Sequence, residues 1–140
     1  MYSPHFLKQE RQRSATSIRL GLDNTPDAEA ESNLQALCTH VLEPVRARFG
    51  RIIVTSAYRS KAVNEALFGE PHSQHLKGEA ADIHVSNEEM GRRYFRYIKH
   101  VLDFDQLLFE HIMNNGCMWL HVSYCRDSSR NRHKAKELSI

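Results

Sequence analysis

The sequence has 140 residues, which suits one domain of ordinary size that can bury a core without a disulfide or metal staple. Hydrophobic residues make up 41% and charged residues 26%, close to the average for globular proteins. The formal net charge is +2, and no basic stripe is interleaved with aromatic residues, so nucleic acid is excluded as an expected partner.

Cysteine usage and the N-terminal segment indicate the compartment. The three cysteines are an odd number and none lies in a C-x-x-C pair, which argues against a disulfide framework and favours a reducing site of synthesis. The first residues hold no apolar run, so we expect no secretory signal peptide. No stretch approaches the roughly 20 apolar residues of a membrane span. We therefore expect cytoplasmic synthesis and no membrane partner, and we also expect a monomer.

The N-terminal half predicts an arm, a long helix and a strand. Residues 1–22 are mixed in character and are interpreted as an N-terminal arm. The D-N-T-P segment at 23–26 predicts a helix start, with Thr25 as the cap and Pro26 at the first helical position. Apolar residues then recur at three- and four-residue steps as far as Gly50, with Pro44 expected to kink or restart the helix. The β-branched run at 51–58 predicts a strand.

The C-terminal half alternates strands with helices. We expect a short helix over 61–68, a loop over 69–79, a strand over 80–85, a helix over 87–101, and strands over 105–110 and 119–124. The Asn114-Asn115-Gly116 segment predicts a hairpin between the last two strands. Residues 126–140 are basic and polar and are expected to form a loosely held tail. The prediction is one α+β domain over 23–125, with an antiparallel sheet and helices on one side.

Three residues have the chemistry of a metal site. His75 precedes the strand that contains Asp82, Gly78 lets the chain turn back between them, and His121 lies mid-strand between apolar neighbours. A buried carboxylate beside imidazoles is costly unless something positive pairs with it, which a divalent metal would do. Two imidazoles and one carboxylate leave a tetrahedral position open, the pattern of catalytic zinc. The alternative is that the strand histidine is an ordinary core or surface residue.

An ordered set of motifs resembles the zinc D-Ala-D-Ala carboxypeptidase family, which shares its fold with the hedgehog signalling domain. The motifs are D-N-T-P at 23–26, S-A-Y-R-S at 56–60, S-Q-H-L-K-G-E-A-A-D at 73–82, D-Q-L-L-F-E at 105–110 and W-L-H-V-S at 119–123. The resemblance implies one Zn²⁺ per chain, bound by His75, Asp82 and His121. It also implies that Arg59 holds a substrate carboxylate or the developing oxyanion, and that Ser73 helps to orient the substrate.

The chain departs from the family pattern at the general base. Several members carry an acid three positions before the last histidine, where this chain has Met118. Glu110 is the best replacement, because relatives of the hedgehog type place an acid at the end of the preceding strand. A two-residue turn at Asn115-Gly116 would also make Glu110 the direct cross-strand neighbour of His121. A register slip of one residue would turn Glu110 to the opposite face.

The sequence thus predicts a zinc peptidase that hydrolyses D-Ala-containing bonds of peptidoglycan stem peptides, as a carboxypeptidase or an endopeptidase. The alternative is a hedgehog-like module that keeps the fold and zinc without turnover, which Met118 favours. A serine-type peptidase is excluded because no S-x-x-K or G-x-S-x-G occurs. The lack of a signal and of a wall-binding domain fits an endolysin-like phage enzyme released to the cell wall, or a small cytoplasmic enzyme.

Overall fold

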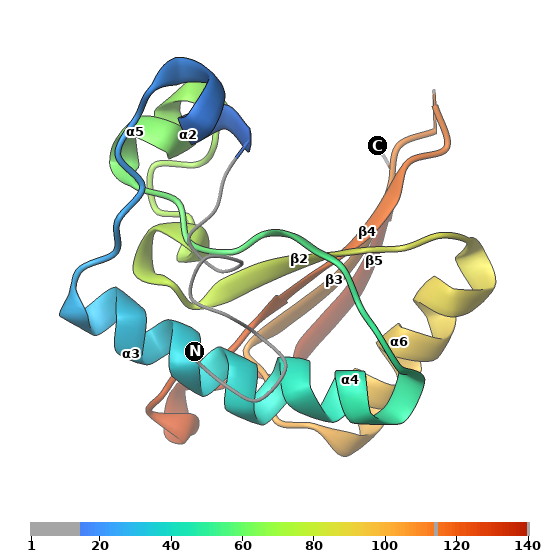
Figure 1. The fold of residues 1–140 in the computed structure, drawn as a ribbon. Coiled ribbons are helices and arrows are strands. Elements are labelled where there is room, and N and C mark those ends of the chain that lie inside the picture. The colour runs from blue at the N-terminus through green and yellow to red at the C-terminus, as the bar shows by residue number, and fades with distance from the viewer. Residues whose placement is uncertain (1–14, 114, 140) are drawn as a thin grey trace.

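The computed structural model describes residues 15–113 and 115–139, which form one α+β unit around a five-stranded sheet (Figure 1). Most of the predicted N-terminal arm, residues 1–14, lies outside the described residues. None of the described helices is long and apolar enough to cross a membrane. Cys117 and Cys125, both within the described ranges, are free thiols.

The sheet has the strand order β1-β2-β4-β3-β5. Its strands are β1 Val54–Ser56, β2 Ala80–His84, β3 Gln106–His111, β4 Met118–Ser123 and β5 Lys134–Ser139. The first four are antiparallel, as predicted, whereas β5 runs parallel to β3 and makes the sheet mixed. The strand predicted over 51–58 shortens to the three residues of β1, where the pairing with β2 shifts register.

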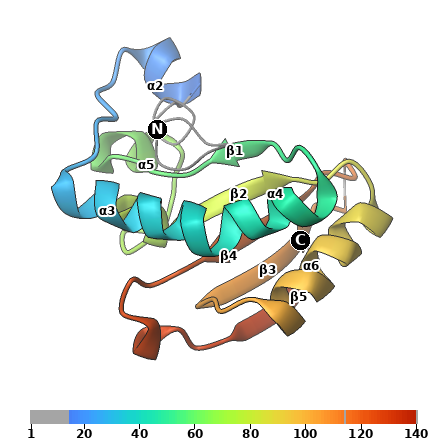
Figure 2. The same ribbon diagram turned by 60° about the horizontal axis from the view of Figure 1, so that its bottom comes forward.

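Helices cover one face of this sheet (Figures 1 and 2). The α-helices are α2 Ala15–Leu20, α3 Ala28–Leu37, α4 Glu43–Phe49, α5 Lys61–Ala66 and α6 Glu88–Val101. The segment η1 Cys38–Leu42 is a π-helix, and η2 Gln74–Lys77 and η3 Ser128–Arg130 are short 3-10 helices. Figure 2 shows α3 and α4 running on from one another, with the end of α4 beside α6, while α2 and α5 lie on the side of α3 away from α6.

The start of α3 differs from the prediction by two residues. Asp27, and not Thr25, is the N-cap, and its carboxylate accepts a hydrogen bond from Ala30 N at 2.8 Å. Pro26 thus stands one residue before the cap and not at the first helical position. The D-N-T-P segment is therefore a connection, and its role becomes clear at the functional site.

Proline also shapes the end of this long helix. Pro44 lies in the first turn of α4, where its missing N–H leaves no partner unsatisfied. The preceding segment η1 is a π-helix, in which Glu43 N donates to Cys38 O five residues back. The helix thus passes from the π-helical η1 into α4 at Glu43, next to Pro44, and ends at Gly50, whose φ of 84° suits glycine.

Strand alternation divides the sheet into a helix-covered face and an opposite face, here called the open face. The helix-covered face carries the core side chains Ala81, Ile83, Leu107, Phe109, Leu120 and Val122, each at most 1% exposed. The open face carries the side chains that alternate with them, among them Asp82, Leu108, Glu110, Trp119 and His121. The helices therefore bury the apolar half of each strand and leave the polar half available for chemistry.

The C-terminal segment is ordered, contrary to the predicted loose tail. Asp105, only 2% exposed, accepts from Arg132 Nε at 2.8 Å, Arg132 Nη2 at 3.0 Å and Gln74 Nε2 at 2.7 Å. Burial raises the pKa of Asp105, but the hydrogen bonds from Arg132 outweigh it and hold that pKa below its usual range. One buried carboxylate thus ties β5 to the loop that carries His75. The strand β5 was not predicted from the sequence, because most of its side chains are exposed and it lacks strict apolar alternation.

The β3–β4 hairpin has a longer loop than predicted. Ile112 N donates to Cys117 O and Gly116 N donates to Ile112 O, so the loop spans residues 113–116. Asn114, which the two-residue turn would have paired with Cys117, lies outside the described residues. Glu110 consequently pairs with Trp119, and not with His121 as predicted, while His121 pairs with Leu108. The shift is two residues, so Glu110 keeps its predicted face.

Candidate metal centre and active site

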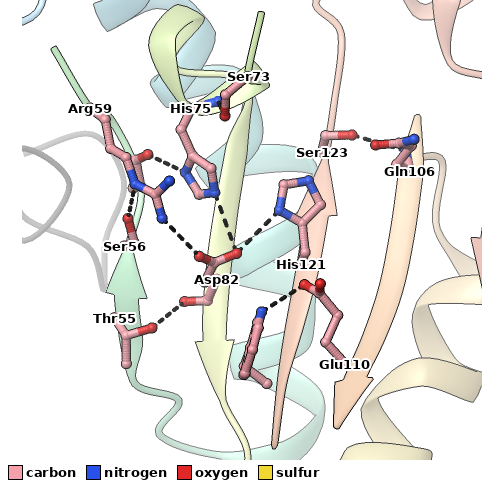
Figure 3. Close-up of polar contacts among 12 residues, drawn as sticks. Thr55, Ser56, Arg59, Ser73, His75, Asp82, Gln106, Glu110, His121 and Ser123 are labelled. Atoms are coloured by element: carbon pink, nitrogen blue, oxygen red, sulfur yellow. Dashed lines mark hydrogen bonds and ion pairs between the residues drawn. The ribbon is translucent and has the colours of Figure 1, made fainter. Parts of the chain in front are cut away.

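His75, Asp82 and His121 converge on the open face, as Figure 3 shows. Asp82 and His121 are direct cross-strand partners on β2 and β4, while His75 comes from η2. The Oδ1 of Asp82 lies 3.1 Å from His121 Nδ1 and 3.4 Å from His75 Nε2. All three ligand atoms lie within 4.8 Å of one another. Side chains from η2, β2 and β4 therefore present their donor atoms to a common point.

The loop before β2 is built to hold His75 in place. Ser73 Oγ accepts a hydrogen bond from His75 N and caps η2, and Gly78 ends η2 with a φ of 72°. A Cβ at Gly78 would lie 2.4 Å from Ala30 O, so glycine is required both for the turn and for the close approach to α3. His75 is 3% exposed, and its Nδ1 lies 2.6 Å from Ala57 O. That carbonyl fixes Nδ1 as the protonated nitrogen and leaves Nε2 facing Asp82.

The Asp82 carboxylate is strongly stabilised in its ionised form. Burial raises its pKa, but the close contacts with His121 and His75 outweigh that effect and hold the pKa well below its usual range. Arg59 Nη2 adds a positive charge 3.5 Å from the second oxygen, Oδ2. Asp82 is therefore available as an anionic ligand at any ordinary pH.

Arg59 lies in a rigid turn beside the three ligands. Its Nε donates to Ser56 Oγ at 3.0 Å, and its backbone N donates to His75 O at 3.0 Å. Asn24 binds the turn on both sides of Arg59: its Nδ2 donates a hydrogen bond to Tyr58 O, and its Oδ1 accepts one from Ser60 N. Sequence reasoning missed this role of Asn24, since the D-N-T-P pattern was interpreted as a helix start and as a family motif, without a role for Asn24. The pairing joins residues more than thirty positions apart and leaves no local signal.

Glu110 lies on the open face beside the same group. Trp119 Nε1 donates to Glu110 Oε2 at 2.7 Å, which holds the carboxylate near His121 (Figure 3). Burial raises the pKa of Glu110, and the Asp82 charge raises it further, whereas the Trp119 hydrogen bond and His121 lower it; the net shift is upward. A carboxylate with a raised pKa binds a proton more readily than an ordinary glutamate, which suits a general base.

Ser73 and two further histidines of the strands, His84 and His111, lie around this group. Ser73 serves as the η2 cap, and its role toward substrate stays a prediction. His111 faces the helix-covered side, where its ring is tilted against that of Phe109 with the centroids 4.2 Å apart. His84 is exposed on β2, opposite Trp119, one row away from Asp82. The site is therefore the group formed by His75, Asp82 and His121, flanked by Arg59 and Glu110.

This donor set fits zinc. Ligand atoms bonded tetrahedrally to zinc at about 2.0–2.1 Å stand roughly 3.3 Å apart, and the two histidine–Asp82 distances here are 3.4 and 3.1 Å. The site combines two imidazoles and one carboxylate on rigid elements with a further acid and an arginine beside them. This combination is typical of metallopeptidase sites.

The comparison with known families agrees with this geometry. The family model described as peptidase M15 matches residues 4–123, most of the chain. The chain therefore belongs to the peptidase M15 family, a zinc D-Ala-D-Ala carboxypeptidase-type family of metallopeptidases. No curated protein matches the chain. The matched region ends with β4, so β5 lies beyond it.

Proposed function

We propose that this protein is a zinc-dependent peptidase that hydrolyses D-Ala-containing peptide bonds of bacterial peptidoglycan, as a carboxypeptidase or an endopeptidase. The observation that carries the proposal is the convergence of His75, Asp82 and His121 with Glu110 and Arg59 on one face of the sheet. The substrate partner is then the stem peptide, and the site of action is the cell wall.

His75, Asp82 and His121 would hold the ion. Zinc bound there polarises a scissile carbonyl and lowers the pKa of its bound water. The contact of His75 Nδ1 with Ala57 O keeps that ring aligned, because a histidine ligand held by a backbone carbonyl cannot rotate freely. The rigid strands β2 and β4 do the same for the other two ligands.

Glu110 and Arg59 supply the remaining chemistry. Glu110 accepts the proton of the attacking water and delivers it to the leaving amine, so that water adds across the broken C–N bond. Trp119 keeps the accepting oxygen in position through its 2.7 Å hydrogen bond. The Arg59 guanidinium donates to Ser56, and its turn is held by hydrogen bonds to Asn24. It stabilises the negative charge that develops on the carbonyl oxygen.

Digestion of purified peptidoglycan, read by mass spectrometry, tests the proposal. We expect loss of a terminal alanine from pentapeptide stems, or splitting of cross-linked dimers, and either product should vanish with a chelator. Glu110→Gln should retain zinc and lower turnover by about a hundredfold or more. Glu89→Gln, an exposed glutamate in the first turn of α6, is the matched control and should behave like the wild type. Near-normal turnover of Glu110→Gln would remove Glu110 from the mechanism.

A second candidate is a hedgehog-like zinc module that binds without turnover. The observation in its favour is Met118, which stands where several family members carry an acid. The same digestion distinguishes the two. A wild-type protein that binds one zinc and retains stem peptide, yet releases no product, would favour the binding module over the peptidase.

A further inference from the structure

A cross-strand row links the candidate metal centre to the C-terminal strand. Asp82 pairs with His121, His121 pairs with Leu108, and Leu108 pairs with Lys136. Residues paired in this way lie on the same face of the sheet, so Lys136 shares the open face with the metal ligands. Strands in a sheet are about 4.8 Å apart, which places the Lys136 backbone roughly 10 Å from that of His121.

Contacts of the alternating residues confirm which way β5 faces. Ala135 packs against the core, and Glu137 accepts hydrogen bonds from Arg92 Nη2 at 2.8 Å and Arg92 Nη1 at 3.2 Å. Arg92 belongs to α6, so Ala135 and Glu137 face the helix-covered side. Lys134, Lys136 and Leu138 must therefore project from the open face.

Lys136 is an unpaired cation within the part of the chain that the structure describes. It is exposed, and no carboxylate among residues 15–113 and 115–139 forms an ion pair with it. The nearest acid of the open face by register is Glu110, which pairs with Leu138 and whose Oε2 is held by Trp119. Between Lys136 and the metal ligands lies Leu108, a partly buried apolar side chain. The row thus leads from the candidate metal ligands Asp82 and His121, past the apolar side chain of Leu108, to the positive charge of Lys136.

We propose that Lys136 forms a subsite for a carboxylate of the substrate, two or three residues from the scissile bond; the proposal rests on the proposed peptidase function. An extended peptide advances about 3.3 Å per residue, so a chain lying across the strands covers the roughly 10 Å to Lys136 in about three residues. The subsite selects stem peptides that carry a free carboxylate over those with a carboxamide there. The subsite lies on β5, which is outside the region that the family model matches.

The competing explanation is that Lys136 only protects an edge strand. β5 is the last strand of the sheet, and lysines on edge strands discourage pairing with other chains. A protective lysine would affect aggregation and leave substrate preference unchanged. A subsite lysine would affect discrimination between two substrates that differ by one charge.

The experiment uses two synthetic stem peptides that differ only in whether the γ-linked glutamyl residue bears a free carboxylate or a carboxamide. Each is offered both with a D-Ala-D-Ala end and as a cross-linked dimer, so that either proposed bond can be cut. The zinc-loaded wild type should prefer the carboxylate about two- to fivefold in kcat/KM, mainly through KM, as expected for one partly exposed ion pair. The preference should fall as salt concentration rises.

Lys136→Gln should abolish the preference, and Lys136→Arg should retain it because the charge remains. Lys99→Gln, an exposed lysine on α6, is the control and should keep the wild-type preference. Equal cleavage of both peptides by the wild type, or an unchanged preference in Lys136→Gln, would overturn the subsite while leaving the peptidase intact. Cleavage of neither peptide in any form would instead refute the proposed function, and the subsite with it.

Discussion

The hydrogen bond between Trp119 and Glu110 offers a direct test of the general base. The N–H of Trp119 lies 2.7 Å from Glu110 Oε2 and favours the ionised carboxyl, which lowers the pKa of Glu110 against the effect of burial. Trp119→Phe removes that donor while keeping an aromatic side chain. A hydrogen bond to a charged group contributes about 1.5–3 kcal/mol. Since Glu110 is only half-buried, the lower figure applies, which corresponds to roughly one pKa unit.

The expected result is a shift in one direction. Glu110 must be ionised to accept a proton, so activity falls as the pH drops through its pKa. Because Trp119→Phe raises that pKa further, the acid limb of the kcat/KM profile should move up by about one pH unit. Zinc content should stay at the wild-type level, since Trp119 is not a ligand. An acid limb that does not move would refute the role of Glu110 as the base or the role of Trp119 in holding it.

Fluorescence gives the same titration without turnover. Trp119 is the sole tryptophan of the chain, so its emission reports on its carboxylate partner. The wild type should show a transition with a midpoint above the usual glutamate pKa, because burial and the Asp82 charge raise the pKa of Glu110. Glu110→Gln should lose the transition. A wild-type transition that survives in Glu110→Gln would assign it to another group.

Four further predictions follow from the structure. His121→Ala should abolish binding of the one zinc expected per chain, and full metal content by elemental analysis would contradict the ligand assignment. Arg59→Ala should lower kcat about a hundredfold with zinc retained, whereas Arg51→Ala, at an exposed arginine, should not. No β-lactam should form a covalent adduct detectable by mass spectrometry, because the mechanism uses no serine nucleophile. Arg132→Ala should lower the free energy of unfolding in urea by about 2 kcal/mol at pH 7. Because the pKa of Asp105 is depressed in the folded state, that loss should shrink as pH falls below the unfolded value of about 4 and Asp105 becomes protonated; an equal loss at pH 3 would contradict it.

Local signals in the sequence were enough to predict most elements, and the family resemblance, not periodicity, named the three residues that converge at the candidate metal centre. The periodicity of α6 and the alternation of β2 and β4 determine which side chains reach the open face, and these patterns depend only on near neighbours. Asn24 could not be found in this way, because its partners Tyr58 and Ser60 lie in another element and any buried polar residue could have served. The start of α3 was missed for a related reason: Thr25 and Asp27 are both good caps, and the local sequence does not choose between them.

The β5 strand was missed because its stability comes from partners outside its own sequence. Most of its side chains are exposed, so its pattern resembles that of a solvated tail. Three interactions order β5: its backbone pairing with β3, the hydrogen bonds from Arg132 to Asp105, and the ion pair between Glu137 and Arg92 of α6. Each of these joins segments at least 27 residues apart in sequence. Hydrophobic pattern therefore underestimates strands that lie at the edge of a sheet and are held by charges.

The position of Glu110 shows which part of a hairpin prediction is robust. A two-residue turn would have placed His121 opposite Glu110, whereas the loop over 113–116 places Trp119 there. Because side chains alternate with a period of two, this two-residue shift leaves Glu110 on the same face as Asp82 and His121, while a one-residue shift would have removed it. The face of the base was thus predictable, but its partner was not. Loop length selects an indole N–H as the neighbour of Glu110, and that neighbour lowers a pKa that burial and Asp82 raise.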